Sequence, residues 1–279
     1  MARYVIIGAG AVGGAIGGRL TLAGLPTVLV ARGDHLQAMR ERGLRLRTPD
    51  EDVTVPVTAV SGPDELQLTD DDILIVATKT HQAPDALRAW ADAPVSDPTG
   101  ATDAEPTPAT SAGERLPIFL ATNGVASERM AQRYFRRVYG VCVWMPVVHL
   151  EPGEVIIRST PRSGMLHLGA VPTGVGEDIL STVAGDLVAA NFDAPRPDDV
   201  MEWKYRKLIS NLGNVFQALV ADQGDWEPLV EAAEREARAV LDAAGVAYTS
   251  DVEESAARAA GFTMKPVPGV PQNLGGYIR

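Results

Sequence analysis

Four polar residues have types and positions that suit the reduction of a carbonyl group. Lys207 and Asn211, in the segment WKYRKLISN, stand four apart on a predicted helix, so an ammonium and an amide can contact one small molecule. Lys79 and Asn123 each follow an apolar segment typical of a buried strand, and open parallel sheets bind ligands at the carboxyl ends of their strands. A lysine whose pKa is lowered by burial can give a proton to the carbonyl oxygen as hydride arrives. From the residues alone, a surface lysine, a turn residue and a salt-bridging lysine are equally good interpretations of Lys207, Asn123 and Lys79.

A glycine-rich turn follows the first apolar run, in the segment VIIGAGAVGGAIGGRL. The spacing G-x-G-x-x-G at Gly8, Gly10 and Gly13 comes directly after a predicted strand and opens a predicted helix. In this context the first glycine permits a sharp turn, the second lets the backbone approach a pyrophosphate, and the third lets the helix pack closely on the sheet. We therefore expect the turn, with Ala11 and Val12, to bind a dinucleotide at the positive end of the helix; the alternative is a purely structural turn.

The end of the second predicted strand, LVARGD, indicates which dinucleotide binds. NAD-selective folds place an acidic side chain on the ribose hydroxyl about 20 residues after the glycines. Arg32 stands near that place, and a guanidinium can hold a 2′-phosphate through two parallel hydrogen bonds. This favours NADP(H) as the cofactor. The alternative is that Arg32 is a solvated surface residue and that Asp34 binds the ribose of NAD.

Composition and charge restrict the classes of partner. The 279 residues include 25 basic and 36 acidic side chains, and the net charge of -11 disfavours binding to nucleic acid or to an anionic membrane surface. The single cysteine, Cys142, excludes an intramolecular disulfide and favours a cytoplasmic location. The histidines lack the spacing of metal ligands, so we expect no metal, and no apolar stretch is long enough for a membrane span.

The order of the predicted elements indicates the fold class. Strands and helices alternate with short connections from the N-terminus, which is typical of a Rossmann-type, doubly wound parallel sheet. We predict an NADP-binding domain over residues 1–172, with a flexible insertion loop rich in Pro, Thr and Ser at residues 93–114. The apolar spacing becomes helical from Glu177 onward. We therefore predict an all-helical domain for substrate binding and dimerisation over residues 173–279, and the sequence leaves open whether a homodimer forms.

Six segments together give the chain a resemblance to a known family. They are GAGAVGGAIGGRL, VLVARGDHLQAMRERGLRL, LIVATKTHQAPDAL, TNGV, EPGEV and KLISN. The chain resembles the ketopantoate reductase family, the 2-dehydropantoate 2-reductases. The resemblance implies an N-terminal domain that binds NADPH, a helical C-terminal domain, and hydride transfer to the C2 carbonyl of a 2-oxo acid. The expected reaction is the conversion of 2-dehydropantoate to pantoate in pantothenate biosynthesis.

The resemblance also implies roles for single residues. Lys207 matches the general acid of the family, and Asn211 matches the substrate-binding asparagine beside it. Asn123 matches an asparagine that contacts cofactor and substrate, Lys79 matches the lysine at the end of the third strand, and Arg32 matches the ligand of the 2′-phosphate. The glycine-rich turn matches the pyrophosphate loop.

The chain departs from the family pattern at several positions. Thr122 stands where the family usually has glutamine, and Val215 stands where it has a second asparagine, with Asn214 one place off. The family continues after the Pro-rich segment with a serine-bearing loop and an acidic helix, so we expect the helical domain of this chain to be shortened at its C-terminus. These departures leave two alternatives open: a family member that reduces a different 2-oxo acid, or a non-catalytic NADP-binding sensor or partner protein.

Overall fold

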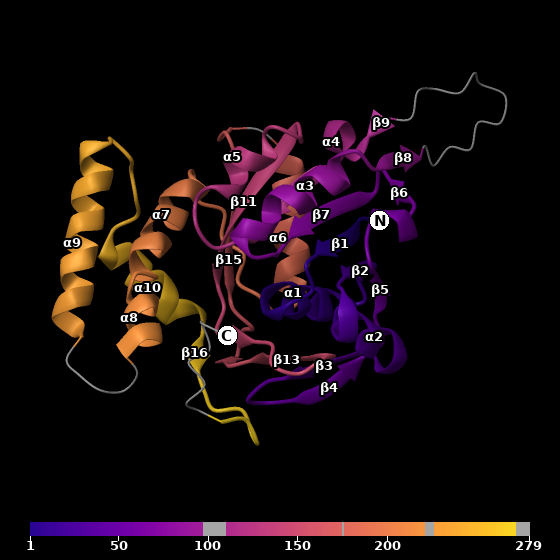
Figure 1. Cartoon of the computed structure of the whole chain (residues 1–279), viewed down its shortest axis with the longest axis horizontal. Helices are drawn as coiled ribbons and strands as arrows, with labels where there is room; N and C mark the ends of the chain where they lie inside the picture. Colours follow the sequence, from indigo (N-terminus) through magenta and orange to yellow (C-terminus); the bar gives the residue numbers. More distant parts are fainter. Residues whose placement is uncertain (97–109, 175, 221–225, 272–279) are drawn as a thin grey trace.

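A seven-stranded sheet forms the centre of the protein (Figure 1). The computed structural model describes residues 1–96, 110–174, 176–220 and 226–271. Along the sheet the strand order is β15-β11-β10-β7-β1-β2-β5, and all neighbours are parallel except β11 and β15. The strands are β1 (Arg3–Ile7), β2 (Thr27–Val30), β5 (Thr58–Val60), β7 (Asp72–Val76), β10 (Pro117–Leu120), β11 (Arg137–Trp144) and β15 (Met165–Ala170).

The strand order places the end of β1 where a ligand can bind. Strand β2 pairs with one side of β1, and β7, which comes later in the chain, pairs with the other side. The connections that leave the two strands run in opposite directions across the sheet, and open parallel sheets bind ligands in the crevice at such a switch point. The glycine-rich turn directly follows β1, so it lies at this crevice.

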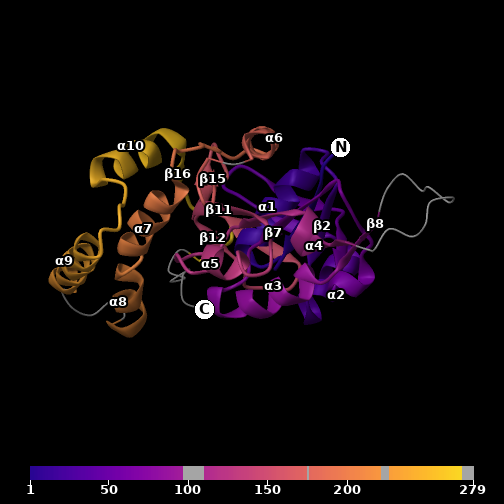
Figure 2. The ribbon, with the colours of Figure 1, turned by 90° about the horizontal axis from the view of Figure 1, so that it is seen from above.

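Helices cover both faces of the sheet (Figure 2), and the residues of β1 alternate between the two layers. Tyr4 and Ile6 belong to an apolar cluster with α1 and α6, whereas Val5 and Ile7 belong to a second cluster with α3 and α5. Strands that are buried on both faces are typical of parallel sheets. The predicted α/β fold is confirmed. The helices of this part are α1 (Ala11–Leu22), α2 (Gly33–Arg42), α3 (Ala83–Ala91), α4 (Ala112–Arg115), α5 (Ser127–Ala131) and α6 (Glu177–Ala189).

Helix α1 is packed between the main sheet and a second, four-stranded sheet. Gly13 and Gly17 face the main sheet, while Gly14 and Gly18 face the second sheet, where a Cβ atom at either would stand 2.8 Å from a leucine or valine side chain. The glycines therefore allow one helix to approach two sheets. The sequence predicts only the approach to the main sheet. The second sheet has the order β12-β13-β3-β4, with β3 (Leu44–Arg47), β4 (Asp52–Val55), β12 (Val147–Val148) and β13 (Glu154–Ile157).

Helix α6 belongs to the core of the main sheet. Leu180 and Val183 lie in the same apolar cluster as β1 and α1, and the hydroxyl of Tyr4 donates a 2.5 Å hydrogen bond to Asp186. The predicted domain boundary at residue 172 would separate α6 from this core. Helical spacing identifies a helix but not the surface on which it packs, so the sequence alone could not place α6. The division into two domains stays a prediction, and the packing of α6 favours a boundary after that helix.

The helices that follow α6 form a separate group beside the sheet (Figure 1). Among them α7 packs on the main sheet, where its first residue, Val200, lies over Gly140 of β11 and Gly169 of β15. Asp199 caps this helix by accepting a 2.7 Å hydrogen bond from the backbone N–H of Met201. The glycines therefore fix where α7 meets the sheet. The group comprises α7 (Val200–Ser210), α8 (Gly213–Val220), α9 (Glu227–Ala243) and α10 (Asp251–Gly261).

Short strands form at both ends of the predicted insertion loop at residues 93–114. Strand β8 pairs antiparallel with β9 and parallel with β6. The prediction of a loop is wrong at these ends, because strands of two or three residues leave no periodicity in the sequence. Residues 97–109 lie outside the described residues. The strands are β6 (Leu68–Thr69), β8 (Pro94–Ser96) and β9 (Thr110–Ser111).

The chain returns to the sheets after α10. Strand β16 (Thr263–Met264) pairs with β14 (Ser159–Thr160), and Val267 packs against Val148 and Ile156 of the second sheet. This segment therefore connects the helical group to the sheets. The rest of the predicted C-terminal stretch, from residue 272, lies outside the described residues.

Two absences hold for the part of the chain that the structure describes. None of its helices has the length and apolar character needed to cross a membrane. None of its His, Cys, Asp and Glu side chains gather in a group of three or more that could hold a metal ion.

The thiol of Cys142 is buried, and burial raises its pKa to about 11, so it is a core residue of β11.

Replacing Gly13 with alanine tests the close approach of α1 to the main sheet. A Cβ atom at Gly13 would overlap the carbonyl oxygen of Gly8, and backbone cannot move away cheaply. We expect Gly13→Ala to lower the free energy of unfolding by about 2 kcal/mol, as measured in urea. Gly10→Ala is the matched control, because nothing lies within 4 Å of a Cβ atom there. Equal stability of the two variants would contradict this account.

Candidate active site

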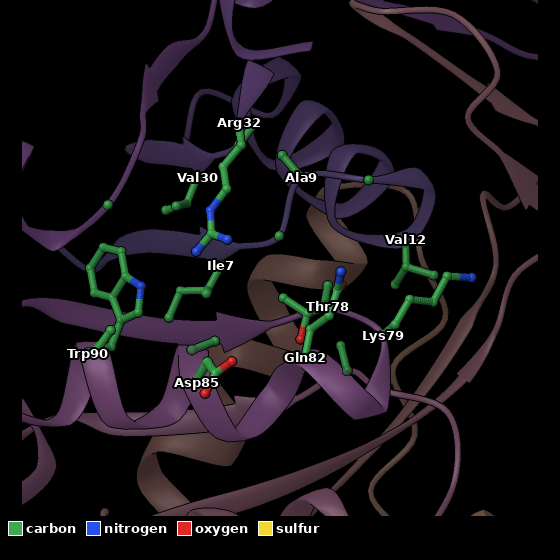
Figure 3. Close-up of a pocket in the computed structure, with 18 of the residues that line it drawn as sticks. Ile7, Ala9, Val12, Val30, Arg32, Thr78, Lys79, Gln82, Asp85 and Trp90 are labelled. Atoms are coloured by element: carbon green, nitrogen blue, oxygen red, sulfur yellow. The ribbon is translucent and has the colours of Figure 1, made fainter. Parts of the chain in front are cut away.

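A cavity of about 690 Å³ runs along the carboxyl ends of the central strands. Its walls come from the segments that follow β1, β2, β5, β7 and β10 and from the end of β11, so it occupies the crevice that the strand order predicts. Figure 3 shows Arg32 pointing toward Ile7, and Lys79 beside Val12 on the other side of the glycine-rich turn. The structure brings eight predicted site residues to this cavity or to its floor: Gly8, Gly10, Ala11, Val12, Gly13, Arg32, Lys79 and Asn123.

The glycine-rich turn has the backbone that an anion site needs. Gly8 has a φ of +97°, which side-chain-bearing residues rarely adopt, and a Cβ atom there would stand 2.7 Å from Thr78. Gly10 is the N-cap residue of α1 and supplies no side chain to cap it. The first N–H groups of a helix have no acceptor within the helix, so they can bind an anion at its positive end. Gly13 packs under the turn and does not line the cavity.

Two basic residues stand at the mouth of the cavity. Arg32 ends the connection after β2 as the N-cap residue of α2, and Lys79 follows β7; both are exposed and line the cavity. Asp34, the alternative ribose ligand, is exposed on α2 and is not among the described lining residues. The two cations can therefore offset the net charge of -11 locally.

The loop after β10 carries Asn123 into the cavity wall. The backbone carbonyl of Asn123 accepts a 2.6 Å hydrogen bond from the hydroxyl of Thr80, which belongs to the loop after β7. This bond ties the two loops together and leaves the amide side chain of Asn123, which is exposed, beside the cavity. The neighbouring Thr122 is buried, and no partner is recorded for its hydroxyl in the described structure.

Lys207 lies against the end of β11, next to the cavity. Its ammonium donates a hydrogen bond to the carbonyl of Val143, a lining residue, and lies 4.2 Å from the centroid of the Trp144 ring. Burial, helped by the nearby charge of Arg258, lowers the pKa of Lys207 from 10.5 to about 8. The ammonium is therefore bonded to a residue that lines the cavity, but Lys207 itself does not line the cavity in this structure.

Asn211 does not join the other predicted residues. It is the C-cap residue of α7, one turn beyond Lys207, and is not among the residues that line the cavity in the described structure. The spacing of four correctly places the two residues on the same side of α7, but the predicted contact of Asn211 with substrate stays a prediction.

Sequence reasoning missed Lys204, one turn before Lys207. The Lys204 side chain is 2% exposed and forms an ion pair with Glu128, which is 1% exposed. Its ammonium also donates to the carbonyls of Leu120, at 3.4 Å, and Thr122, at 3.1 Å. This set of partners joins α7 to the loop that carries Asn123. The lysine stands 76 residues from Glu128 in the chain, so no local pattern could have paired them.

A comparison with known families identifies the family of this chain. The family model described as "Ketopantoate reductase PanE/ApbA" matches residues 4–173. The chain belongs to the ketopantoate reductase family. Membership makes it an oxidoreductase, and it points to a nicotinamide cofactor and a small 2-oxo acid substrate.

Two relatives named as members of this family are similar to the chain, and a third structure shares its fold. A 2-dehydropantoate 2-reductase from Mesorhizobium japonicum is 29% identical over 269 residues, which are 90% of this chain and 79% of that protein. The crystal structure of a PanE/ApbA family ketopantoate reductase from Ralstonia eutropha is 28% identical, with a TM-score of 0.70 over 92% of this chain and 80% of that one. The ternary structure of D-mandelate dehydrogenase with NADH and anilino(oxo)acetate has a TM-score of 0.71 at 19% identity, covering 92% of this chain and 78% of that one, and shares the fold.

Removing one partner of the buried ion pair tests its role in stability. Lys204→Met leaves the Glu128 carboxylate buried without a cation, so we expect the free energy of unfolding to fall by about 3–5 kcal/mol. The double variant Lys204→Met/Glu128→Leu should recover most of this loss, because a well-packed apolar pair can replace a buried ion pair. Both are measured by urea unfolding. A double variant no more stable than the single one would contradict the pairing.

Proposed function

We propose that the protein is an NADPH-dependent reductase of a small 2-oxo acid, with 2-dehydropantoate as the first candidate and pantoate as its product. The observation that carries the proposal is the cavity at the switch point of the sheet, with the glycine-rich turn and Arg32 along it and Lys207 behind its end. Family membership supports the class of reaction. The cofactor would supply the hydride. The residues of this chain would bind the cofactor, orient the substrate and protonate its carbonyl oxygen.

The cofactor would be held mainly by backbone and by two cations. The N–H groups of the turn at Gly10, Ala11 and Val12 suit a pyrophosphate, because they stand at the positive end of α1. Arg32 suits a 2′-phosphate, since its planar guanidinium can bind two phosphate oxygens at once. Lys79, which lines the same cavity, would supply the second cation.

Lys207 would be the proton donor. A pKa of about 8 keeps its ammonium protonated at neutral pH and makes it a far stronger acid than a solvated lysine. The ammonium has three N–H donors, and Val143 accepts one of them, so others are available for a carbonyl oxygen. As negative charge grows on that oxygen, the proton would pass from Nζ of Lys207 to it.

The asparagines would orient the substrate. Asn123 lines the cavity beside the end of β10 and can donate and accept hydrogen bonds through its amide. Asn211 would contact the substrate from α7, which requires the helix or the substrate to bring it to the cavity. Asn123 would therefore orient the substrate from the cavity wall, and the contact of Asn211 would depend on the bound state.

A different 2-oxo acid is the second candidate substrate. Val215, at the place of the second family asparagine, is 55% exposed on α8 and cannot hydrogen bond to a substrate. The D-mandelate dehydrogenase structure contains NADH and anilino(oxo)acetate in the same fold. The substrate assay therefore includes aromatic and branched 2-oxo acids beside 2-dehydropantoate.

Initial rates with both cofactors test the proposal as a whole. We expect loss of NADPH absorbance with a 2-oxo acid, and much slower loss of NADH. In Arg32→Ala we expect the affinity for NADPH to fall about tenfold or more, since charge-assisted hydrogen bonds are lost, while the affinity for NADH stays the same. Equal use of the two cofactors would contradict the role of Arg32. NADPH binding without turnover of any 2-oxo acid would indicate a non-catalytic protein.

Replacing Lys207 separates proton donation from cofactor binding. We expect Lys207→Ala to lower kcat by about 10²- to 10⁴-fold, the contribution of a general acid, with an unchanged dissociation constant for NADPH. Lys207→Arg keeps the charge but holds its proton too tightly, so it should be nearly as slow. Lys265→Ala, at an exposed site after α10, is the control and should turn over normally. Near-normal turnover of Lys207→Ala would remove this residue from the mechanism.

At saturating NADPH, the pH dependence of kcat/KM for the 2-oxo acid reports the protonation of Lys207 in the enzyme–NADPH complex before the 2-oxo acid binds. The protonated form is the active acid, and its pKa is about 8, so kcat/KM should be level below that pH and fall tenfold per unit above it. The rates are measured from pH 6.5 to pH 10 with saturating NADPH. A profile that stays flat to pH 10 would show that no group with this pKa gives the proton.

A further inference from the structure

His35 is a lining residue of the cavity to which the proposed reaction assigns no role. It lies in the first turn of α2, three residues after Arg32, and its ring is partly buried. Its Nε2 atom is 2.7 Å from the carbonyl oxygen of Ala9, which stands between Gly8 and Gly10 in the glycine-rich turn. Its Nδ1 atom is 2.8 Å from the backbone nitrogen of Gly153, in the loop before β13. The ring therefore joins three segments that are far apart in the chain.

The two backbone partners determine the state of the His35 ring. A carbonyl oxygen can only accept, so Nε2 must carry the proton that points to Ala9. The N–H of Gly153 can only donate, so Nδ1 must be unprotonated. The contacts are satisfied together by one form alone, the neutral ring with its proton on Nε2. An imidazolium would place two N–H groups against each other at Gly153.

The contact with Ala9 has a consequence for the anion site. A peptide group is planar and trans, so the carbonyl of Ala9 and the N–H of Gly10 point in opposite directions. A hydrogen bond that fixes the carbonyl therefore also fixes the N–H of Gly10, a cavity residue. It also keeps the carbonyl oxygen, which would repel a phosphate, turned toward the ring of His35.

We propose that neutral His35 is a positioning residue that holds the Ala9–Gly10 peptide in the orientation that binds the cofactor pyrophosphate. This inference rests on the proposed cofactor site. It assigns His35 no contact with the reacting atoms, so its effect falls on cofactor affinity and not on the chemical step.

The surroundings of His35 favour its neutral form. Burial of the ring, followed by the charge of His149, lowers the pKa of His35. His149 is the titratable side chain that faces it, with ring centroids 4.1 Å apart, and Arg32 lies on the cavity side of the same helix turn. The glycine-rich turn and Gly153 present only backbone groups to the ring.

Glutamine and leucine variants of His35 test the inference. In His35→Gln, the amide nitrogen can donate to Ala9 and the amide oxygen can accept from Gly153, so we expect NADP⁺ to bind within about threefold of the parent protein at pH 8. In His35→Leu both bonds are lost, and we expect about tenfold weaker binding, the effect of one hydrogen bond. His149→Leu is the matched control, since it removes the neighbouring ring without touching the turn.

Kinetics distinguish positioning from a general loss of structure. His35→Leu should raise KM for NADPH about tenfold and leave kcat and KM for the 2-oxo acid unchanged. Unchanged NADP⁺ binding in His35→Leu would overturn the proposal. Equal losses in His35→Leu and His149→Leu would also overturn it, because they would show packing and not the bond to Ala9.

The stability of the free protein tests the neutral form without any cofactor. A His pKa that is lower in the folded state than in the unfolded state gives stability that is present above the unfolded value, about 6.5, and is lost as pH falls below it. The parent protein should therefore lose more unfolding free energy than His35→Gln between pH 7 and pH 5. His167, which has its pKa lowered to about 4 by burial, contributes equally to both and cancels in the difference. Identical pH slopes would overturn the proposal even if NADP⁺ proved not to be the ligand.

Discussion

The close approach of α1 to two sheets is the constraint on which the site depends. Gly13 lets the start of the helix lie against the turn after β1, and Gly14 and Gly18 let its other side lie on the second sheet. A side chain at any of these positions would push the helix outward and move its first N–H groups away from the strand ends. The position of the proposed anion site is therefore set by the glycines on two faces of α1. The second sheet, through Gly153 and His35, also supports the turn from the other side.

A second constraint connects the helical group to the cavity. The carboxyl ends of β10 and β11 present backbone carbonyls, and the two lysines of α7 bind them: Lys204 takes those of Leu120 and Thr122, and Lys207 takes that of Val143. Lys204 forms an ion pair with Glu128, so its role is to attach α7 to these strand ends. Lys207 has no carboxylate among these partners, and burial lowers its pKa to about 8. One turn of helix thus supplies the attachment and, in the proposed reaction, the proton.

Much of the site could be predicted because its parts are local in the sequence. The glycine-rich turn, Arg32, Lys79 and Asn123 each follow a recognisable strand, and parallel strands bring their carboxyl ends to one edge. The parts that could not be predicted join distant segments. Glu128 pairs with Lys204 across 76 residues, and His35 meets Gly153 across 118.

The packing of whole elements could not be predicted from the sequence either. Helix α6 has ordinary amphipathic spacing, which does not say that it packs on the main sheet. The second sheet combines β3 and β4 with β12 and β13, about a hundred residues later in the chain, so its contact with α1 is a tertiary property. Asn211 shows that a correct local prediction does not establish a site. Helical spacing places it one turn from Lys207, but it does not line the cavity in the described structure.

A crystal structure of the protein with NADPH and a non-reacting 2-oxo acid analogue tests the central claim most directly. The account predicts the pyrophosphate at the N–H groups of Gly10 to Val12, the 2′-phosphate on Arg32, and Nζ of Lys207 within about 2.6–3.2 Å of the oxygen that replaces the keto group. A complex in which Lys207 stays on the carbonyl of Val143 while another side chain donates to that oxygen would contradict it.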